Sequence, residues 1–432
     1  MRRASIASAL AVAAAAGVWA QQSRSNPCDA GNGGLTLPTG FCASVVADNL
    51  GPARHMAVSP GGDLYVMLRR AVEGGPAGAV IALRDADGDG RFEQQERFGA
   101  GLNGTGILWH DGSLYIGSDT RLARIRMNGN ELVPTSQPET IVEFPAQRGH
   151  TAKPFAFGRN NDVFVHVGAP SNACQEPDRR AEVPGQTPCP LLAEHGGIWK
   201  YDAARVGQKH MAGNRYATGI RHTTSLMAHP TTGTLFQVQH GRDQLDTMWP
   251  KLFTAQQNGE LPAEEMHVIK DGSNFGWPYC YFDLAQNKRL QNPEYGGDGK
   301  KEADCAKFDK PIATFPAHNA PLDLMFYTGT QFPQEYRGGA FVTFHGSWNR
   351  APMAMDGYNV RFVPFKGDTP AGAHRVFASG FTGKPRIMNP NEAAYRPTGL
   401  VQARDGSIYV SDDVKGRIWK VTYSGNRTGT GE

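Results

Sequence analysis

Residues 398–413 read TGLVQARDGSIYVSDD: an apolar stretch, a turn around Asp405 and Gly406, and a second stretch with alternating character. Period-two alternation of apolar residues, bounded by turn-forming residues, is typical of β-strands. A third strand-like segment, GRIWKVTYSG, follows at 416–425. The pattern predicts a unit of three successive strands.

The same unit recurs along the whole chain. Five further copies begin at His55, Gly106, Lys153, Thr224 and Leu322. Six such units predict an all-β, six-bladed β-propeller, because a generic β-sandwich is not expected to repeat one unit six times. The spacing between copies is widest at about 170–195 and 242–315. These two segments are therefore predicted to be loop insertions.

Six cysteines fall into close sequence pairs: Cys28 and Cys42, Cys174 and Cys189, Cys280 and Cys305. An even number of cysteines in an exported chain favours disulfides, and we favour nearest-neighbour pairing among the possible connectivities. No Cys-x-x-Cys spacing occurs, which argues against a cysteine metal site and against covalently attached c-type haem.

The first 20 residues are typical of a secretory signal peptide. Arg2 and Arg3 precede a small apolar run, and Val18–Ala20 offers a cleavage site. The run is short for a membrane anchor, and no later stretch is long and apolar enough to span a bilayer. We therefore expect cleavage near Ala20, a single domain at 21–432, and a periplasmic or secreted protein.

The charges are nearly balanced. Lys and Arg total 44, whereas Asp and Glu total 41. This composition carries neither a nucleic-acid signature nor a polybasic membrane signature. The predicted partners are therefore small molecules, with no nucleic acid and no membrane span.

One acidic loop matches a calcium-binding spacing. Asp85, Asp87, Asp89, Gly90 and Glu96 fit D-x-D-x-D-G-x5-E, in which the carboxylates converge on a cation. Predicted strands, rather than the helices of an EF-hand, flank the loop. A structural Ca²⁺ site and a solvated Asp-Gly turn both account for the pattern.

Histidine and arginine recur at the same phase of four consecutive repeats, where a strand enters or leaves the predicted channel mouth. The residues concerned are His150, Arg221, His222, His318, Trp348, Asn349, Arg350 and Arg396. Because loops from several blades converge at one mouth, we expect these side chains to form a ring. Arginine binds carboxylates bidentately, and a neutral histidine can act as general base. The ring suits an anionic ligand with several carboxylates.

The most informative stretches are HTAKPFAFGRNNDVFVHVG at 150–168, YATGIRHTTSLMAHPTTGTLFQVQHGRDQLD at 216–246, SNFGWPYCYF at 273–282 and HGSWNR at 345–350. On these residues, and over roughly 40–424, the chain resembles the soluble pyrroloquinoline quinone (PQQ)-dependent sugar dehydrogenases, especially the sorbosone-dehydrogenase-like branch. That family has a six-bladed propeller fold, which agrees with the count of repeats.

The resemblance implies roles for individual residues. His150 corresponds to the histidine that takes a proton from the substrate hydroxyl while hydride passes to PQQ. The backbone carbonyls of Gly241 and Arg242 correspond to ligands of a Ca²⁺ ion that acts as Lewis acid. The implied function is oxidation of a sugar or related aldehyde or alcohol, with a cytochrome or quinone as electron acceptor. The residues expected to contact the cofactor are Arg221, His222, His318, Trp348, Arg350 and Arg396.

The chain departs from the family pattern at three positions. Gly149 stands where an acidic residue usually precedes the histidine, His222 stands in place of Asn, and Arg242 in place of Pro. Two other functions are compatible with a propeller. A Ca²⁺-dependent lactonase-type hydrolase would need Asp, Glu and Asn in the channel, where this chain offers His and Arg. A non-catalytic propeller could bind a protein or glycan through its disulfide-tied loops.

Overall fold

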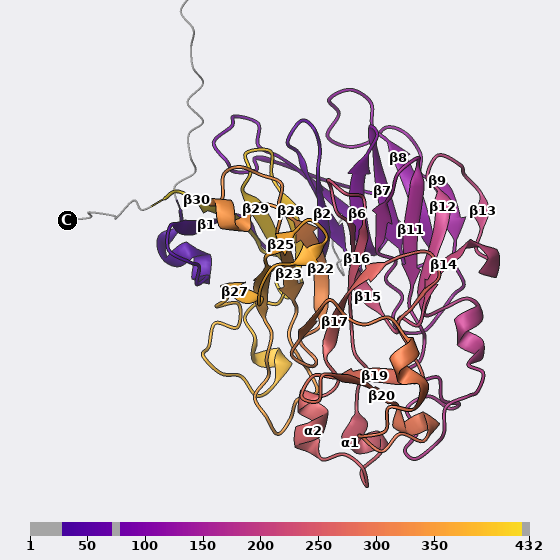
Figure 1. Ribbon diagram of the computed structural model, residues 1–432. Helices are drawn as coiled ribbons and strands as arrows, with labels where there is room; N and C mark the ends of the chain where they lie inside the picture. Colours follow the sequence, from indigo (N-terminus) through magenta and orange to yellow (C-terminus); the bar gives the residue numbers. More distant parts are fainter. Residues whose placement is uncertain (1–27, 71–77, 426–432) are drawn as a thin grey trace, which may run out of the picture.

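The computed structural model describes residues 28–70 and 78–425. The predicted signal peptide, with its cleavage site near Ala20, lies outside these residues. Six sheets form the six predicted blades (Figure 1), and in each of them three consecutive strands pair antiparallel. The all-β, six-bladed propeller is thus confirmed. Among the described residues, no helix is long and apolar enough to cross a membrane.

The blades follow the repeats in order, each running from an inner to an outer strand. Blade one contains β2 (Ala53–Val58), β3 (Leu64–Leu68), β4 (Val80–Arg84) and β5 (Gln94–Phe98); blade two contains β6 (Gly104–His110), β7 (Ser113–Ser118), β8 (Arg121–Arg126) and β9 (Glu139–Glu143), with β13 (Gln208–Lys209) added at its edge. Blade three contains β10 (Phe155–Phe157), β11 (Asp162–Val167), β12 (Gly197–Asp202), β14 (Arg215–Thr218) and β18 (Ser273–Asn274).

The second half continues the pattern. Blade four contains β15 (Thr223–Ala228), β16 (Leu235–Gln239), β17 (Glu264–Ile269) and β21 (Ala313–Phe315); blade five contains β22 (Pro321–Phe326), β23 (Ala340–Phe344), β24 (Asn359–Val363) and β27 (Arg375–Ala378). Blade six contains β28 (Pro397–Gln402), β29 (Ile408–Asp412), β30 (Ile418–Tyr423) and, outermost, β1 (Phe41–Ala47).

The two ends of the chain close the ring. The early strand β1 pairs antiparallel with the last strand β30, so that Phe41 lies opposite Tyr423 (Figure 1). Phe41 also packs edge-on against Phe332 and Phe377 of blade five. Its ring centroid lies 4.8 Å from that of Phe332 and 5.0 Å from that of Phe377. Burying a side chain of this size contributes roughly 1.5–3 kcal/mol. Blade six is therefore completed by both backbone pairing and apolar packing.

The inner strands approach one another closely. A Cβ atom added to Gly117 of β7 would lie 2.0 Å from the carbonyl oxygen of Lys153, just before β10. Since real Cβ atoms do not approach backbone atoms that closely, only glycine fits there. This contact sets the spacing of blades two and three beside the channel.

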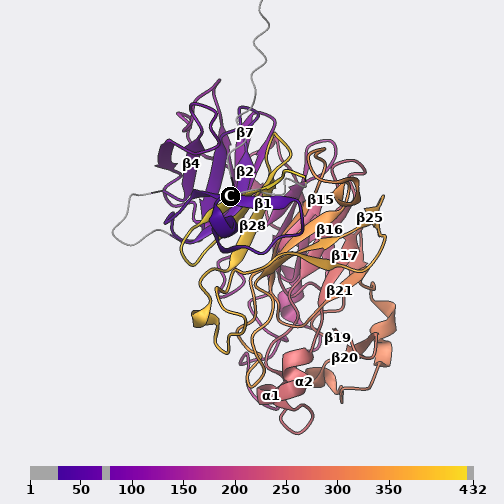
Figure 2. The same ribbon diagram turned by 90° about the vertical axis from the view of Figure 1, so that its left-hand side faces the viewer.

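The long segments carry two of the three disulfides, Cys174–Cys189 and Cys280–Cys305; the third, Cys28–Cys42, links β1 to the preceding segment. Each joins sequence neighbours, as predicted, and no described cysteine is free. The second segment includes α1 (Leu245–Met248), α2 (Ala255–Glu260) and the hairpin β19 (Cys280–Asp283) and β20 (Lys288–Gln291), which lie together at one end of the molecule in both views (Figures 1 and 2). A further hairpin, β25 (Phe365–Lys366) and β26 (Thr369–Pro370), follows β24.

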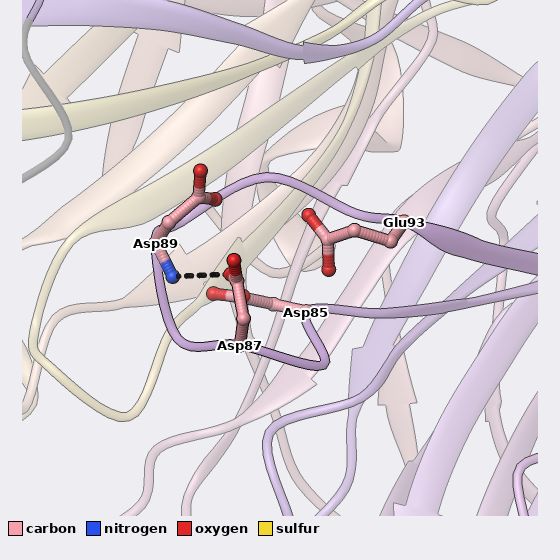
Figure 3. Close-up of side chains that lie close together, drawn as sticks. All are labelled: Asp85, Asp87, Asp89 and Glu93. Atoms are coloured by element: carbon pink, nitrogen blue, oxygen red, sulfur yellow. Dashed lines mark hydrogen bonds between the residues drawn. The ribbon is translucent and has the colours of Figure 1, made fainter.

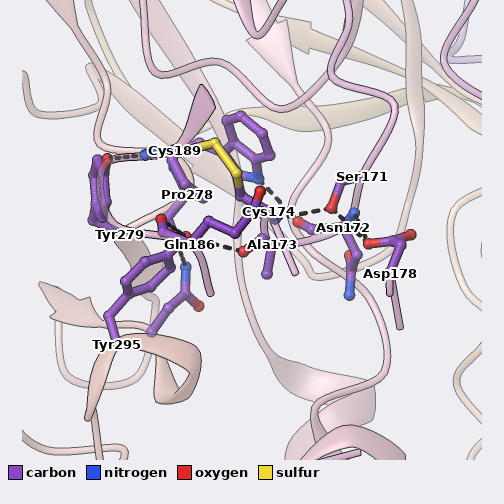
Figure 4. Close-up of a disulfide and its surroundings, with 12 residues drawn as sticks. Ser171, Asn172, Ala173, Cys174, Asp178, Gln186, Cys189, Pro278, Tyr279 and Tyr295 are labelled. Atoms are coloured by element: carbon purple, nitrogen blue, oxygen red, sulfur yellow. Dashed lines mark hydrogen bonds between the residues drawn. A yellow bond between two sulfur atoms is a disulfide. The ribbon is translucent and has the colours of Figure 1, made fainter. Parts of the chain in front are cut away.

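The two long segments bind each other through polar contacts around the Cys174–Cys189 disulfide. The Tyr279 hydroxyl accepts a hydrogen bond from the Cys189 amide at 3.0 Å (Figure 4). The Tyr295 hydroxyl donates to the Ala173 carbonyl at 3.1 Å (Figure 4). The two segments therefore form one structural unit beside the channel mouth.

Candidate functional site

Residues from blades three to six surround a cavity of about 220 Å³ at the channel mouth. Its lining consists of His150, Arg221, His222, His240, Gly241, Asp243, Glu264, His318, Ala320, His345, Gly346, Trp348, Asn349 and Arg396. Most of the predicted ring is thus brought together. Arg350 does not line the cavity, because its guanidinium donates to the carbonyls of Gly259 and Ala317 at 2.8 and 3.4 Å.

The imidazole of His150 has a defined tautomer. Its Nδ1 lies 2.5 Å from the carbonyl oxygen of Ala169, which can only accept a hydrogen bond. Nδ1 must therefore carry the proton, which leaves Nε2 with a free lone pair. Burial, and then the positive charge of Arg221, lower the pKa of His150 to about 3. His150 is thus a neutral histidine with an unprotonated Nε2.

Two further histidines, His222 and His240, lie next to His150 in the cavity. The ring of His222 stacks on that of His150, with centroids 4.5 Å apart and planes inclined by 18°. The ring of His240 lies 5.0 Å from that of His222. His222 Nδ1 and His240 Nε2 are buried without a hydrogen-bond partner among the described residues. Both residues line the cavity, so that a bound ligand would lie beside their rings.

Asp243 links two arginines of the site, Arg221 and Arg179. The sequence did not single it out. Its Oδ2 accepts hydrogen bonds from Arg221 at 2.5 Å and from Arg179 at 3.0 Å. Its Oδ1 accepts one from Asn349 Nδ2 at 3.1 Å. Burial by itself would raise the pKa of Asp243, but the positive charge of Arg221 is the main influence that holds it well below its usual range. The carboxylate is ionised and fully engaged by donors.

Glu264, at the start of β17, is the second acidic group of the cavity. Its two oxygens accept hydrogen bonds from the amides of Gly241 at 2.7 Å and Ala320 at 3.0 Å. Burial raises the pKa of Glu264 to about 8, so that the group is mainly protonated at neutral pH. The cavity therefore has little free negative charge.

Of the two backbone carbonyls expected to bind a metal ion, that of Gly241 already has a hydrogen-bond partner. The Gly241 carbonyl accepts a hydrogen bond from Arg221 Nη1 at 2.8 Å. The buried guanidinium of Arg242 forms an ion pair with Glu294, in the second long segment. Arg242 therefore ties the site to that segment, in the place where the family has proline.

Arg396 supports the opposite wall of the cavity. Its guanidinium donates to the carbonyls of His345 at 3.1 Å and Gly346 at 2.8 Å, and lies 5.5 Å from the Tyr358 ring centre. The Nε2 atom of His345 in turn lies within hydrogen-bond distance of Asp413 Oδ1, at 2.8 Å. Blades five and six are thus joined through the side chains that border the site.

The residues that the sequence did not indicate carry different signals. Asp243 and His240 both lie in the QHGRD stretch at 239–243, next to the two predicted carbonyl ligands, so their position directly after β16 could have pointed to them. Glu264 follows a proline-containing loop and shares no motif with the other site residues. Its place in the cavity depends on the fold of the second long segment.

The acidic loop between β4 and β5 lies on the outer strands of blade one. Asp85, Asp87, Asp89 and Glu93 bring carboxylate oxygens within 4.8 Å of one another (Figure 3). Asp85 also accepts hydrogen bonds from the amides of Gly88 and Gly90, both at 2.8 Å. Glu96, predicted as the fourth carboxylate, is not in this group: it lies on β5, opposite Ala82, and is exposed.

If this loop binds Ca²⁺, chelation should lower the melting temperature of the protein. At a Ca²⁺ concentration about 100 times Kd, binding to the folded state alone contributes about 2.7 kcal/mol. Asp87→Ala should remove this shift, and the exposed Asp304→Ala should keep it. Thermal unfolding with and without EGTA makes the measurement. A wild-type melting temperature that EGTA leaves unchanged would identify the loop as a bare turn.

Comparison with known proteins bears on the whole propeller. The sequence matches the TrAA12-like family over residues 35–424. The chain belongs to the TrAA12-like family. This confirms the resemblance inferred from the sequence, because the relatives of this chain include PQQ-dependent dehydrogenases.

Two such relatives are fungal proteins. A PQQ-dependent sugar dehydrogenase of Hypocrea jecorina is 24% identical over 321 residues, 68% of this chain and 67% of that protein. A PQQ-dependent pyranose dehydrogenase of Coprinopsis cinerea is 28% identical over 185 residues, 37% of this chain but only 24% of that protein. An uncharacterized protein of Borreliella burgdorferi is 26% identical over 267 residues, 61% of this chain and 58% of that protein. The TrAA12-like chain thus spans only part of several relatives.

Solved structures share its fold. The calcium structure of the AA12 enzyme of Trichoderma reesei superposes with a TM-score of 0.72 and 21% identity, covering 90% of this chain and 97% of that one. The holo form of the PQQ domain of Coprinopsis cinerea pyranose dehydrogenase gives a TM-score of 0.70 and 19% identity, covering 90% and 97%. The propeller of the TrAA12-like protein is the same fold.

Proposed function

We propose that this TrAA12-like protein is an exported, PQQ-dependent dehydrogenase that oxidises a sugar or a related aldehyde or alcohol. The observation that carries the proposal is the neutral His150, with its proton fixed on Nδ1, beside Arg221 in one cavity. A base and an anion-binding group side by side are what hydride abstraction from a hydroxyl-bearing carbon needs. A cytochrome or quinone would then receive the electrons.

The donor set of the cavity fits a cofactor with several carboxylates. Nε of Arg221, like the two free histidine nitrogens, is buried without a hydrogen-bond partner among the described residues. Asp243 is offset by two arginines, and Glu264 is mainly protonated, so neither repels an anion strongly. Arg221, His222, His318, Trp348 and Arg396 are the predicted contacts that line the cavity and would hold the cofactor.

PQQ, when bound, supplies the carbonyl carbon that accepts hydride. His150 Nε2 accepts the proton of the substrate hydroxyl. The Nδ1–H group stays hydrogen-bonded to the Ala169 carbonyl, which fixes the orientation of the ring. A bound anionic group near Arg221 offsets the positive charge that lowers the pKa of His150, and so raises this pKa towards the working range of a base. The residues of this chain thus bind, orient and move one proton.

The family resemblance also implies a Ca²⁺ ion on the carbonyls of Gly241 and Arg242. The fit to these residues is incomplete, because the guanidinium of Arg221 already donates to the Gly241 carbonyl, and its charge repels a second cation nearby. Proton transfer from the substrate to His150 is therefore proposed without a metal ion. Ca²⁺ remains part of the proposal as a cofactor whose requirement is tested with EGTA.

The decisive experiment is titration of PQQ into the purified protein, followed by the absorbance of the bound quinone and by dye reduction with a panel of aldoses. We expect saturable binding at micromolar PQQ and turnover with at least one sugar. Repeating the titration in EGTA and then in excess Ca²⁺ tests the metal. Absence of binding at micromolar PQQ with Ca²⁺ present would reject the dehydrogenase.

A further inference from the structure

The side chain of Gln147 holds the loop that carries His150 to the end of β11. Its Nε2 lies 3.0 Å from each of three carbonyl oxygens, those of Gly149, His150 and Gly168. The first two belong to the loop of His150, and the third precedes Ala169. Because the Ala169 carbonyl accepts the Nδ1 proton of His150, the Gln147 amide links the backbone on both sides of that hydrogen bond.

Lys153 determines which way the Gln147 amide points. Its side chain has no exposed surface, and its Nζ donates to Gln147 Oε1 at 3.4 Å and to the Thr151 carbonyl at 2.7 Å. An ammonium group only donates and a carbonyl only accepts. The amide oxygen must therefore face Lys153 and the amide nitrogen the three carbonyls. The reversed amide would place its oxygen against three other oxygens.

The backbone around His150 needs such support. Gly149 and His150 have φ angles of +69° and +45°, in the left-handed region that a residue with a side chain rarely adopts. Conformations of this kind persist only where the surroundings enforce them. Gly168 packs directly on this loop, since a Cβ atom there would lie 2.7 Å from the His150 carbonyl oxygen and 2.9 Å from His222 Nδ1.

We propose that Gln147 and Lys153 are positioning residues for His150, which together keep its Nδ1 as the donor to Ala169 and its Nε2 as the unprotonated nitrogen. They would take over the orienting role of the acidic residue that the family usually has at the position of Gly149. The catalytic meaning of this inference rests on the proposed function. The tautomer of His150 can be measured without it.

The test is ¹⁵N–¹H correlation of the imidazole nitrogens in the labelled, cofactor-free protein, with the His150 signals assigned by their loss in His150→Gln. Wild type should show the Nδ1–H tautomer alone. Gln147→Met removes the three donations at nearly equal volume, so the Nε2–H tautomer should appear. In PQQ-loaded enzyme kcat should fall about 10- to 100-fold, as for loss of an orienting partner, with KM nearly unchanged.

Gln208→Met is the matched control. Gln208 is also buried, and its Nε2 donates to two backbone carbonyls, those of Asp202 and Arg205, both at 2.7 Å. It belongs to β13, at the outer edge of blade two, so its loss should leave the tautomer of His150 unchanged. Lys153→Met should shift the tautomer in the same direction as Gln147→Met, and Lys153→Arg should restore the wild-type signal.

The outcomes separate this inference from the proposed function. A pure Nδ1–H tautomer in both Gln147→Met and Lys153→Met would overturn the positioning role, whatever the activity. A shifted tautomer in a protein that oxidises no sugar would support the positioning role and reject the dehydrogenase. If Gln147→Met does not fold, Gln147→Asn keeps the amide but shortens its reach, and it should produce the same shift.

Discussion

Replacing His150 with alanine should lower kcat by about 10²- to 10⁴-fold, the typical contribution of a general base, while PQQ still binds. The reason lies in the division of roles within the cavity. His150 has its Nδ1 committed to Ala169 and only Nε2 left for the substrate, whereas the charged contacts available to the cofactor come from arginine. Stopped-flow dye reduction gives kcat, and quinone absorbance gives Kd.

His229→Ala serves as the control for this prediction. His229 is also buried but lies in the turn between β15 and β16, where its Nδ1 accepts hydrogen bonds from the amides of Thr231 and Thr232 at 3.2 and 3.3 Å. Its loss should leave both kcat and Kd near wild type. Equal losses of PQQ affinity and turnover in His150→Ala would contradict a proton-transfer role and make the histidine a binding residue.

Arg221→Ala should weaken PQQ binding by about 1.5–3 kcal/mol, the range for hydrogen bonds to charged groups, or roughly ten- to more than a hundredfold in Kd. Two arginines, Arg221 and Arg396, line the cavity, and Arg221 is the more buried of them, at 4% exposed. Because it is desolvated, its attraction for an anionic ligand is screened little by water. Fluorescence or absorbance titration of PQQ gives the change in Kd.

Arg179→Ala is a close match for this substitution. Arg179 binds the same oxygen of Asp243, at 3.0 Å, but does not line the cavity. Both variants remove one partner of Asp243, so a similar fall in melting temperature is expected from each. Only Arg221→Ala should lose most of its PQQ affinity. Equal losses of affinity would mean that Asp243, rather than direct contact with Arg221, organises the cofactor site.

The fold could be predicted from the sequence because its signal is local. Three strands of each blade are neighbours in the sequence, so alternation and turn residues along a local stretch define them, as in TGLVQARDGSIYVSDD at 398–413. The pairing of cysteines followed the same logic. The phase of the strands also placed His150, Arg221 and Arg396 at one mouth, since each stands at the same point of its repeat.

Contacts between distant side chains could not be predicted in this way. Arg350 has the correct phase, yet its guanidinium binds carbonyls outside the cavity. Asp243 lies next to the predicted carbonyl ligands, but its hydrogen bond to Arg179 depends on how the first long segment folds. Glu96 fits the spacing of a calcium loop, but strand pairing places it on β5 and leaves Glu93 beside the aspartates. Each of these depends on the direction of a side chain in three dimensions.

The pairing of β1 with β30 has a consequence for the order of events during folding. Cys42 and Thr422, which face each other across these strands, are 380 positions apart in the chain. As the chain emerges, β1 must therefore stay unpaired until β30 has emerged as well. An unpaired strand edge invites aggregation and contacts of long sequence separation form slowly. If the chain is exported, as proposed, its secretion should depend on a holding chaperone more than secretion of a propeller whose last blade comes from one contiguous segment.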